Sequence, residues 1–533
     1  MLISAPAEFT AGFALSDYLR KAGMAKKQKR QEPLTIDTLW GDRLKEEAAD
    51  GLLAFTSGRD VRPSPPYDER LITYDIWGSK AHAIMLWKQN LISREETQTL
   101  VRGLEEVENL YAKGSFIVDP AKEDVHSTIE TYLIEHYGME SAGRLHTGRS
   151  RNDQIALDLR LYMRAEALDF VMLLIGLIDT MTLVAKNHRD AIMPGYTHHQ
   201  PGMIGSWGHL LFSFALPLER DVKRFVNWYD LFNYNPLGGA AGYGTRLPLD
   251  RKLTARLMGF DGVHRSSIDP THNRWEPESE LGYAVSILMN HLSNLAQTLI
   301  LLSTSEFGML SLNDAYCTGS SLMPQKRNPD PLEAVKGKSA YAQGMLVAML
   351  ALGRSLFAGY NRDSQWSKYP LMDVVEECKP SLPIMKEIIA SLTFNRKAAL
   401  ESCKRGFVAA TDVVEWMVRK HSLPFRKAKM VVEKAVAYAE QQNSEIVTTG
   451  ALKRALADMD INLTFKDRDL ALCQKPERAL QARKIKGGPS PAALMHEIDL
   501  LQKTMRDHAL WLKRKRVHIE KARKEMEEII SSL

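Results

Sequence analysis

The sequence is poor in cysteine, and the motifs that mark several enzyme classes are missing from it. Its 533 residues include only four cysteines, Cys317, Cys378, Cys403 and Cys473. None forms a Cys-x-x-Cys pair or stands at a metal-ligand spacing from a histidine, so we expect free thiols and no metal site. A glycine-rich phosphate loop, a Gly-x-Ser-x-Gly elbow and a His-Glu-x-x-His helix are also absent, which argues against the chemistries that these motifs mark.

The sequence also lacks an excess of one charge and a secretory signal. Its 70 Lys and Arg nearly cancel its 65 Asp and Glu, and the net charge of +5 gives no reason to expect nucleic acid binding. Residues 1–33 contain no charged segment followed by a continuous apolar run, so we expect an N-terminal extension of a cytoplasmic protein. The uncharged stretch 281–305 is long enough to span a bilayer. Because Asn290, His291 and Asn294 interrupt it, we expect a core helix and no membrane partner.

Long helical patterns are abundant instead, and extended alternation of apolar and polar residues is scarce. The patterns cover Gln154–Lys186, Trp207–Asn233, Glu278–Gly308 and Pro331–Phe357. They predict an all-α protein with long central helices that pack as a bundle. The turn-rich breaks divide the chain into the extension 1–33, an N-terminal helical domain 34–145, a central long-helix domain 146–395 and a C-terminal helical domain 396–533.

Two polar segments coincide with predicted helix starts. In "EDVHSTIE" (123–130), Asp124 is a candidate N-cap and His126 lies on the first turn, a pattern that fits a capped surface helix equally well. In "HTGRSRNDQ" (146–154), Ser150, Arg151 and Asn152 stand where a helix begins. A helix N-terminus with an arginine beside it binds a carboxylate well, although an ordinary cap has the same composition.

Two further segments combine reactive side chains with proline. In "MPGYTHHQPG" (193–202), prolines flank Thr197, His198 and His199, which predicts a constrained turn with a candidate acid–base histidine. In "GSSLMPQKRNPDPLE" (319–333), a serine base would need nearby amides or a cation, and Lys326 and Asn328 follow Ser320 within reach. Together the four segments suit proton abstraction next to a carboxylate, a step that places a second negative charge on that carboxylate.

Several of these segments resemble one family of lyases. "GSSLMPQKRNPDPLE" resembles the signature of the fumarase/aspartase superfamily, and "HTGRSRNDQ" and "MPGYTH" are similar to the forms found in its argininosuccinate lyase family. "WGDR" (40–43), "YDERLITYDIWGSKAHA" (67–83) and "TDVVEWMVRKHSLPFRKAK" (411–429) resemble further parts of that family. The likeness covers roughly residues 39–498.

The resemblance implies a three-domain, all-α homotetramer whose central helices form one bundle, with each active site built from three subunits. It implies an anti β-elimination, without a cofactor, that releases fumarate from an N-substituted aspartate, a small-molecule substrate. The implied catalytic residues are Ser320 as the base, His198 as the acid, Lys326 as a cation for the new charge and Glu333 as the carboxylate that orients the histidine.

The resemblance also implies two groups of substrate-binding residues. One group holds the succinate half of the substrate: Ser150, Arg151, Asn152, Thr197 and Asn328. The other group holds the amino-acid half: Ser64, Asp68, Tyr360, Gln365 and Lys368.

The sequence departs from the family pattern near the leaving group. Asparagine, serine and two tryptophans replace expected acidic residues within Asn273–Trp275 and Trp366–Ser367. Lost carboxylates weaken recognition of a guanidinium, so the sequence leaves the substrate open. Three functions are therefore weighed. They are an argininosuccinate lyase, a lyase of another N-substituted aspartate such as an aminopolycarboxylate, and a structural protein of lyase ancestry.

Overall fold

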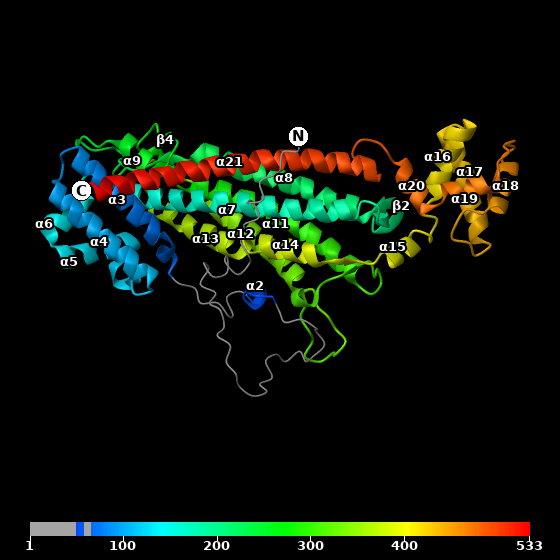
Figure 1. Ribbon diagram of the computed structural model, residues 1–533, viewed down its shortest axis with the longest axis horizontal. Coiled ribbons are helices and arrows are strands. Elements are labelled where there is room, and N and C mark those ends of the chain that lie inside the picture. The colour runs from blue at the N-terminus through cyan, green and yellow to red at the C-terminus, as the bar shows by residue number, and fades with distance from the viewer. Residues whose placement is uncertain (1–48, 58–65) are drawn as a thin grey trace, which may run out of the picture.

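The computed structural model describes residues 49–57 and 66–533, and most of this part of the chain is helical (Figure 1). This confirms the all-α fold class predicted from the sequence. The tetrameric arrangement involves further copies of the chain and stays a prediction. Residues 1–33, Trp40–Arg43 and Ser64 lie outside the described residues.

Four long helices form the centre of the molecule, where the sequence predicted them. They are α7 (Arg151–Asn187), α8 (Trp207–Phe232), α11 (Trp275–Ser303) and α12 (Asp330–Leu352). α7 packs along α8, and α11 packs along α12. α11 and α12 end earlier than predicted, because Thr304 adopts an extended conformation and Gly353 closes the last turn of α12.

Two central helices, α7 and α11, are long and apolar enough to cross a membrane by length and composition alone. Half of the apolar window in each is buried inside the protein. α7 contacts α8, α14 and α21, and α11 contacts α8, α12 and α13. Packing in the core of a helical bundle therefore accounts for their apolar character, as we expected for residues 281–305.

The segments before α7 include the helices at one end of the bundle, where Figure 1 shows α3 to α6. With 3₁₀ helices labelled η, they are α2 (Leu52–Ser57), η2 (Tyr67–Leu71), α3 (Ile72–Lys88), α4 (Arg94–Ala112), η3 (Pro120–Lys122), α5 (Val125–Tyr137), α6 (Met139–Ala142) and η4 (Gly143–His146). α3 packs on α4 and α7, and α5 packs on α4. This arrangement brings η2 and the start of α5 close to the start of α7.

Within residues 49–57 and 66–533, three two-stranded sheets join the helices. β1 (Ile192–Thr197) pairs with β2 (Gln200–Ser206) in an antiparallel hairpin between α7 and α8. β3 (Tyr234–Asn235) pairs in parallel with β4 (Gly262–Val263), and β5 (Leu310–Ser311) pairs antiparallel with β6 (Thr393–Phe394). The remaining connecting helices are α9 (Arg251–Leu257), α10 (Asp269–His272), η5 (Asp314–Tyr316), η6 (Arg362–Ser367), α13 (Lys368–Cys378) and α14 (Ser381–Ser391).

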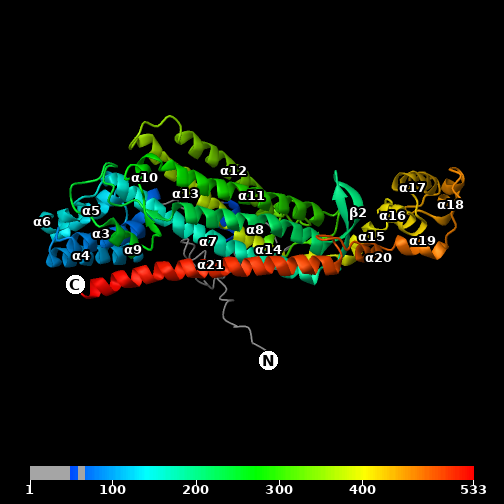
Figure 2. The ribbon, with the colours of Figure 1, turned by 90° about the horizontal axis from the view of Figure 1, so that it is seen from above.

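The last part of the chain forms a small helical unit and one very long helix. The helices of this part are α15 (Arg396–Ser402), α16 (Ala410–His421), α17 (Phe425–Glu440), α18 (Thr449–Ala457), α19 (Asp467–Cys473), α20 (Pro476–Ala482) and α21 (Pro491–Ser531). Val413, Val431 and Leu452 belong to a hydrophobic core separate from that of the bundle. α21 then returns along α7 and α8 (Figure 2). The domain boundaries 34–145, 146–395 and 396–533 stay predictions.

Candidate active site

A buried ion pair joins two residues that lie far apart in the sequence. Lys368 Nζ lies 2.5 Å from Asp68 Oδ1, and both residues are at least nine-tenths buried. The backbone N–H of Val125, at the start of α5, donates to Asp68 Oδ2 at 3.4 Å. An ammonium and a carboxylate held together in this way complement the charged ends of an amino acid. The structure thus brings together two of the residues assigned to the amino-acid half.

Polar and aromatic side chains continue along the segment before Lys368. The Tyr360 hydroxyl donates to Gln365 Oε1 at 2.7 Å, so these two predicted residues also meet. Trp366 is 61% exposed and packs edge-on against Tyr369 with ring centroids 5.4 Å apart. Tyr369 packs in the same way against Tyr67, the neighbour of Asp68 in η2, at 4.8 Å. One of the departures from the family pattern therefore borders this group.

The start of α7 is the predicted anion site. Ser150 is the N-cap: its Oγ accepts the N–H of Asn152 at 3.3 Å, and its own N–H donates to Asp153 Oδ1 at 2.9 Å. Arg151 donates to Gln154 Oε1 at 3.0 Å and forms an ion pair with Glu130 of α5. The helix dipole and a fixed guanidinium at this position favour a bound carboxylate.

Asp153 ties the start of α7 to the loop after β3. Its Oδ2 accepts the backbone N–H groups of Gly238 and Ala240 at 3.0 and 2.8 Å. Burial raises the pKa of Asp153 to about 6, against the lowering effect of these hydrogen bonds. The carboxylate thus fixes two segments and leaves Arg151 and Asn152 half-buried and accessible.

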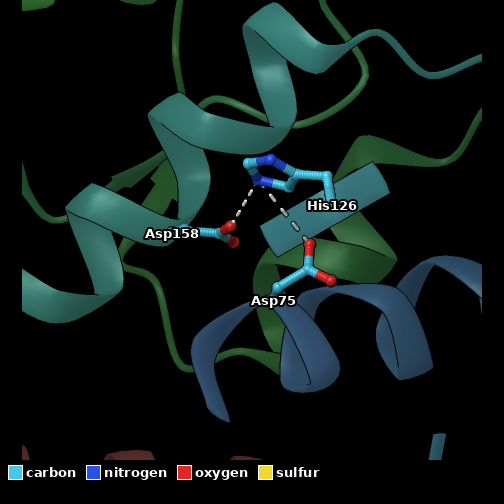
Figure 3. Close-up of side chains that lie close together, drawn as sticks. All are labelled: Asp75, His126 and Asp158. Atoms are coloured by element: carbon cyan, nitrogen blue, oxygen red, sulfur yellow. Dashed lines mark hydrogen bonds and ion pairs between the residues drawn. The ribbon is translucent and has the colours of Figure 1, made fainter. Parts of the chain in front are cut away.

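A buried histidine lies behind these groups. Asp124 caps α5 as predicted, since it accepts the N–H of Ser127 at 2.7 Å. The alternative of a surface helix is wrong for His126, which is 2% exposed because its ring packs between α3 and α7. Its Nε2 lies 2.8 Å from Asp158 Oδ2 and 3.9 Å from Asp75 Oδ1 (Figure 3).

Sequence reasoning missed both of these aspartates. They stand in largely apolar helical stretches, "LITYDIW" for Asp75 and "QIALDLRL" for Asp158. A buried carboxylate needs a charged or hydrogen-bonding partner. An aspartate on the apolar face of a predicted helix is therefore the sequence signal that could have identified both residues.

The Ser320 segment forms a closed loop before α12. The backbones of Thr318 and Asn328 pair with each other, and Asn328 Nδ2 donates to the Gly319 carbonyl at 3.0 Å. Ser320 Oγ accepts the N–H groups of Leu322 and Met323 at 3.3 and 3.0 Å. A serine base needs nearby amides or a cation, and two amides are present here.

The other predicted residues of this segment lie at its exposed rim. Lys326 is exposed on the loop, and Glu333 is exposed on the first turn of α12. Pro331 stands in that same first turn, as predicted. The loop therefore presents its charged groups outward, where another molecule or another copy of the chain can reach them.

Thr197 and His198 stand at the tip of the β1–β2 hairpin. His198 and His199 form its two-residue turn with φ values of +53° and +62°. Positive φ at both turn residues is strained for side chains other than glycine, by about 1–3 kcal/mol each, and such strain is concentrated at functional sites. All three side chains are exposed. The prediction of a constrained turn is confirmed.

The described chain does not unite these groups in one place. The hairpin contacts α15 and α20, and Figures 1 and 2 show β2 at the opposite end of the bundle from α5 and α6. The 37 residues of α7 place about 55 Å between Ser150 and the end that carries the hairpin. The 23 residues of α12 place about 35 Å between the Ser320 loop and the segment of Tyr360.

Two family models match the chain. One is described as "Lyase" and covers residues 61–344, and the other is described as "Argininosuccinate lyase C-terminal" and covers residues 407–470. The chain is 37% identical over 463 residues to the argininosuccinate lyase of Campylobacter concisus (strain 13826), which is 87% of this chain and 97% of that relative. It is 38% identical over 459 residues to the argininosuccinate lyase of Syntrophus aciditrophicus (strain SB), 86% and 94% of the two chains.

Solved structures share the fold at lower sequence identity. An EDDS lyase in complex with formate is 24% identical, with a TM-score of 0.84 over 92% of this chain and 97% of that chain. A fumarate lyase from Mesorhizobium sp. BNC1 is 16% identical, with a TM-score of 0.66 over 88% of this chain and 100% of that chain. These likenesses establish the three-dimensional arrangement of the helices.

Proposed function

Since this chain belongs to the argininosuccinate lyase family and is a C–N lyase that releases fumarate, we propose that it cleaves L-argininosuccinate to L-arginine and fumarate. The observation that carries this substrate is the group formed by Asp68, Lys368, Tyr360 and Gln365, in which charged and hydrogen-bonding side chains suit the ends of an amino acid. Fumarate is then the half bound at the start of α7.

We assign the elimination to residues of the Ser320 loop and of the hairpin. Ser320 Oγ takes the proton from Cβ, and the N–H groups of Leu322 and Met323 stabilise the charge on that oxygen. The electron pair moves into the neighbouring carboxylate, where Lys326 and Asn328 hold the added charge. The Cα–N bond then breaks, a C=C bond forms, and His198 protonates the departing nitrogen. Glu333 orients His198 from another copy of the chain.

We propose that the enzyme is a homotetramer whose active sites are shared between subunits. The distances of about 55 Å along α7 and about 35 Å along α12 support this, because one small substrate cannot touch both ends of either helix. A stripe of small and apolar residues on the exposed side of α12 also supports close packing of helices from neighbouring chains: Gly337, Ala340, Gly344, Val347, Ala348 and Ala351.

The four cysteines fit the proposed cytoplasmic location. Cys317, Cys378 and Cys403 are buried free thiols, and Cys473 is a half-buried free thiol. Free thiols are typical of a reducing compartment.

Incubation with L-argininosuccinate tests the proposed substrate. We expect fumarate, followed by its ultraviolet absorbance, and L-arginine in equal amounts. The Ser320→Ala variant is the control, since it keeps the fold and lacks the proposed base. If wild-type protein produces neither compound, the substrate is wrong.

A second candidate is a lyase of another N-substituted aspartate. The exposed Trp366 beside Tyr369 favours it, because an aromatic surface at the leaving-group side suits an amine other than arginine. The fold shared with an EDDS lyase supports the same candidate. Fumarate and a panel of amines, run in the reverse direction, separate the two: addition to arginine alone contradicts the second candidate.

A further inference from the structure

We propose that His126, which the elimination does not use directly, is a positioning residue that fixes the two halves of the substrate site relative to each other. This inference rests on the proposed function only for the location of those halves. The ring contacts neither the Ser320 loop nor the exposed surface, because it is 2% exposed and lies between α3, α5 and α7 (Figure 3). Its effect must therefore pass through its neighbours.

Three carboxylates surround the ring of His126, and each comes from a different segment. Asp158 Oδ2 of α7 lies 2.8 Å from Nε2, and Asp75 Oδ1 of α3 lies 3.9 Å from the same nitrogen. Asp124 Oδ2, in the N-cap of α5, lies 3.7 Å from Nδ1. Burial alone would lower the pKa of His126, but the interactions with Asp124, Asp158 and Asp75 outweigh burial and raise the pKa to about 10. The ring is therefore a cation at neutral pH.

Carboxylates and an imidazole are also groups that bind metal ions, but the geometry at His126 fits a protonated ring. Nε2 is within direct hydrogen-bonding distance of Asp158, so the ring nitrogen already has a partner. Arg149, itself buried, lies close enough to Asp75 and Asp158 for its charge to be felt by both. The imidazolium and the guanidinium together offset two of the three carboxylate charges of Asp75, Asp124 and Asp158.

A chain of hydrogen bonds leads from this cluster to the succinate half. Gln154 Nε2 donates to Asp75 Oδ1 at 2.6 Å, and Gln154 Oε1 accepts from Arg151 at 3.0 Å. Arg151 also pairs with Glu130, which lies one helical turn after His126 on α5. The guanidinium that faces the substrate carboxylate is thus held through Asp75 and through the helix that carries His126.

A second connection leads to the amino-acid half. Val125 precedes His126, and its backbone N–H donates to Asp68 Oδ2 at 3.4 Å. Asp68 in turn pairs with Lys368. Because the ring anchors the first turn of α5 to α3 and α7, a shift of that turn would move Asp68 and Arg151 together. An error of about 1 Å in such a position lowers rates by about 10²-fold.

The experiment is a double-mutant cycle between His126→Gln and Gln154→Met. We expect His126→Gln to lower kcat about 10²-fold in the intact tetramer and to weaken fumarate binding. Gln154→Met cuts one of the connections to Arg151 without touching the ring, so the loss in kcat of the double variant should be smaller than the product of the two single losses. His136→Gln, at an exposed position of the same helix, is the matched control and should behave as wild type. If the losses in kcat of the two single variants multiply in the double variant, as they would for two independent structural defects, the proposal is overturned.

The pH dependence of stability gives a second readout. His126 binds its proton more tightly in the folded than in the unfolded chain, so its contribution is full below pH 6.5 and is lost as pH rises to about 10. The stability difference between wild type and His126→Gln should shrink over this range. The charge of His126 lowers the pKa of His146, so His146 titrates at a different pH in the two proteins, and the comparison is made above pH 6.5, beyond that titration. Arg149 also faces the cluster and is present in both proteins. A stability difference between wild type and His126→Gln that does not change with pH would contradict a charged ring at His126.

Two further measurements keep the outcomes distinct. Fumarate binding by calorimetry does not depend on the amine, so it tests the positioning role even if argininosuccinate is not the substrate. Wild-type protein that binds fumarate but leaves argininosuccinate intact overturns the proposed substrate only. If His126→Gln does not assemble into a tetramer, Asp158→Asn replaces it, because that variant keeps the ring and removes one carboxylate charge beside it. The double-mutant cycle is then made between Asp158→Asn and Gln154→Met. A lower kcat after treatment with a chelator would favour a metal ion and overturn the imidazolium.

Discussion

The oxygen of Ser320 lies where a negative charge on it would be stabilised. It accepts two backbone N–H groups, from Leu322 and Met323, within the loop that the Thr318–Asn328 pairing closes. A serine hydroxyl is a weak base unless its alkoxide is stabilised in this way. Burial and hydrogen-bond partners therefore determine what each polar side chain can do. His126 is enclosed by carboxylates, whereas Ser320 and His198 are accessible.

Replacement of this oxygen tests its role. We expect Ser320→Ala to lower kcat by about 10²–10⁴-fold, the range for loss of an acid–base group, while fumarate binding is kept. Stopped-flow or steady-state ultraviolet absorbance of fumarate gives the rate. Ser321→Ala, a change at the exposed neighbour, should keep near-wild-type turnover. Equal losses in the two variants would contradict the assignment of the base to Ser320.

At the scale of elements, the start of α7 is stabilised by more than a helix cap. Asp153 belongs to a capping box with Ser150 and also accepts the N–H groups of Gly238 and Ala240. α4 begins with a similar box, formed by Ser93 and Glu96, but there Ser93 is exposed, and Glu96 pairs outside α4 with the side chain of Arg144 in place of backbone N–H groups. The capping box of α7 therefore also holds the loop after β3, a role that the box of α4 does not have.

The two caps give a matched comparison. We expect Asp153→Ala to lower the free energy of unfolding by about 3 kcal/mol, because two N–H groups lose their partner in a buried setting as well as the cap. Ser93→Ala should cost about 1 kcal/mol. Chemical denaturation followed by circular dichroism measures both. Similar losses in the two variants would mean that the contacts to Gly238 and Ala240 contribute little.

For the whole molecule, the length of the central helices determines how a site can be built. α7 and α12 hold the hairpin and the Ser320 loop far from the group of Asp68 and Lys368. Association of several copies of the chain would bring these parts together from different subunits.

Mixing two inactive variants tests shared sites. Ser320→Ala and His198→Asn should each be nearly inactive alone, because each lacks one proton-transfer group. After joint denaturation and refolding, random association should restore roughly a quarter of the wild-type activity at sites that draw both intact residues from different chains. Fumarate release measures the recovery, and sedimentation measures the assembly. A monomer in sedimentation, or no recovery in a mixed tetramer, would contradict shared sites.

The sequence predicted the helices and caps well, because these depend on residues a few positions apart. The four central helices, the Asp124 and Ser150 caps and the constrained turn at His198 were all found within short windows. The burial of His126 was not predicted, because a first-turn histidine looks the same in sequence whether its helix faces solvent or the core.

By itself, the sequence determined the all-α fold class, the starts of the helices and the reactive residue types, since turns, caps and helical periodicity are local properties. Only the tertiary structure decided which of these residues meet. It pairs Asp68 with Lys368 across 300 positions, places His126 between Asp75 and Asp158, and keeps Ser320 apart from all of them. Such contacts depend on how rigid helices of fixed length pack against one another, and spacing along the chain does not record that packing.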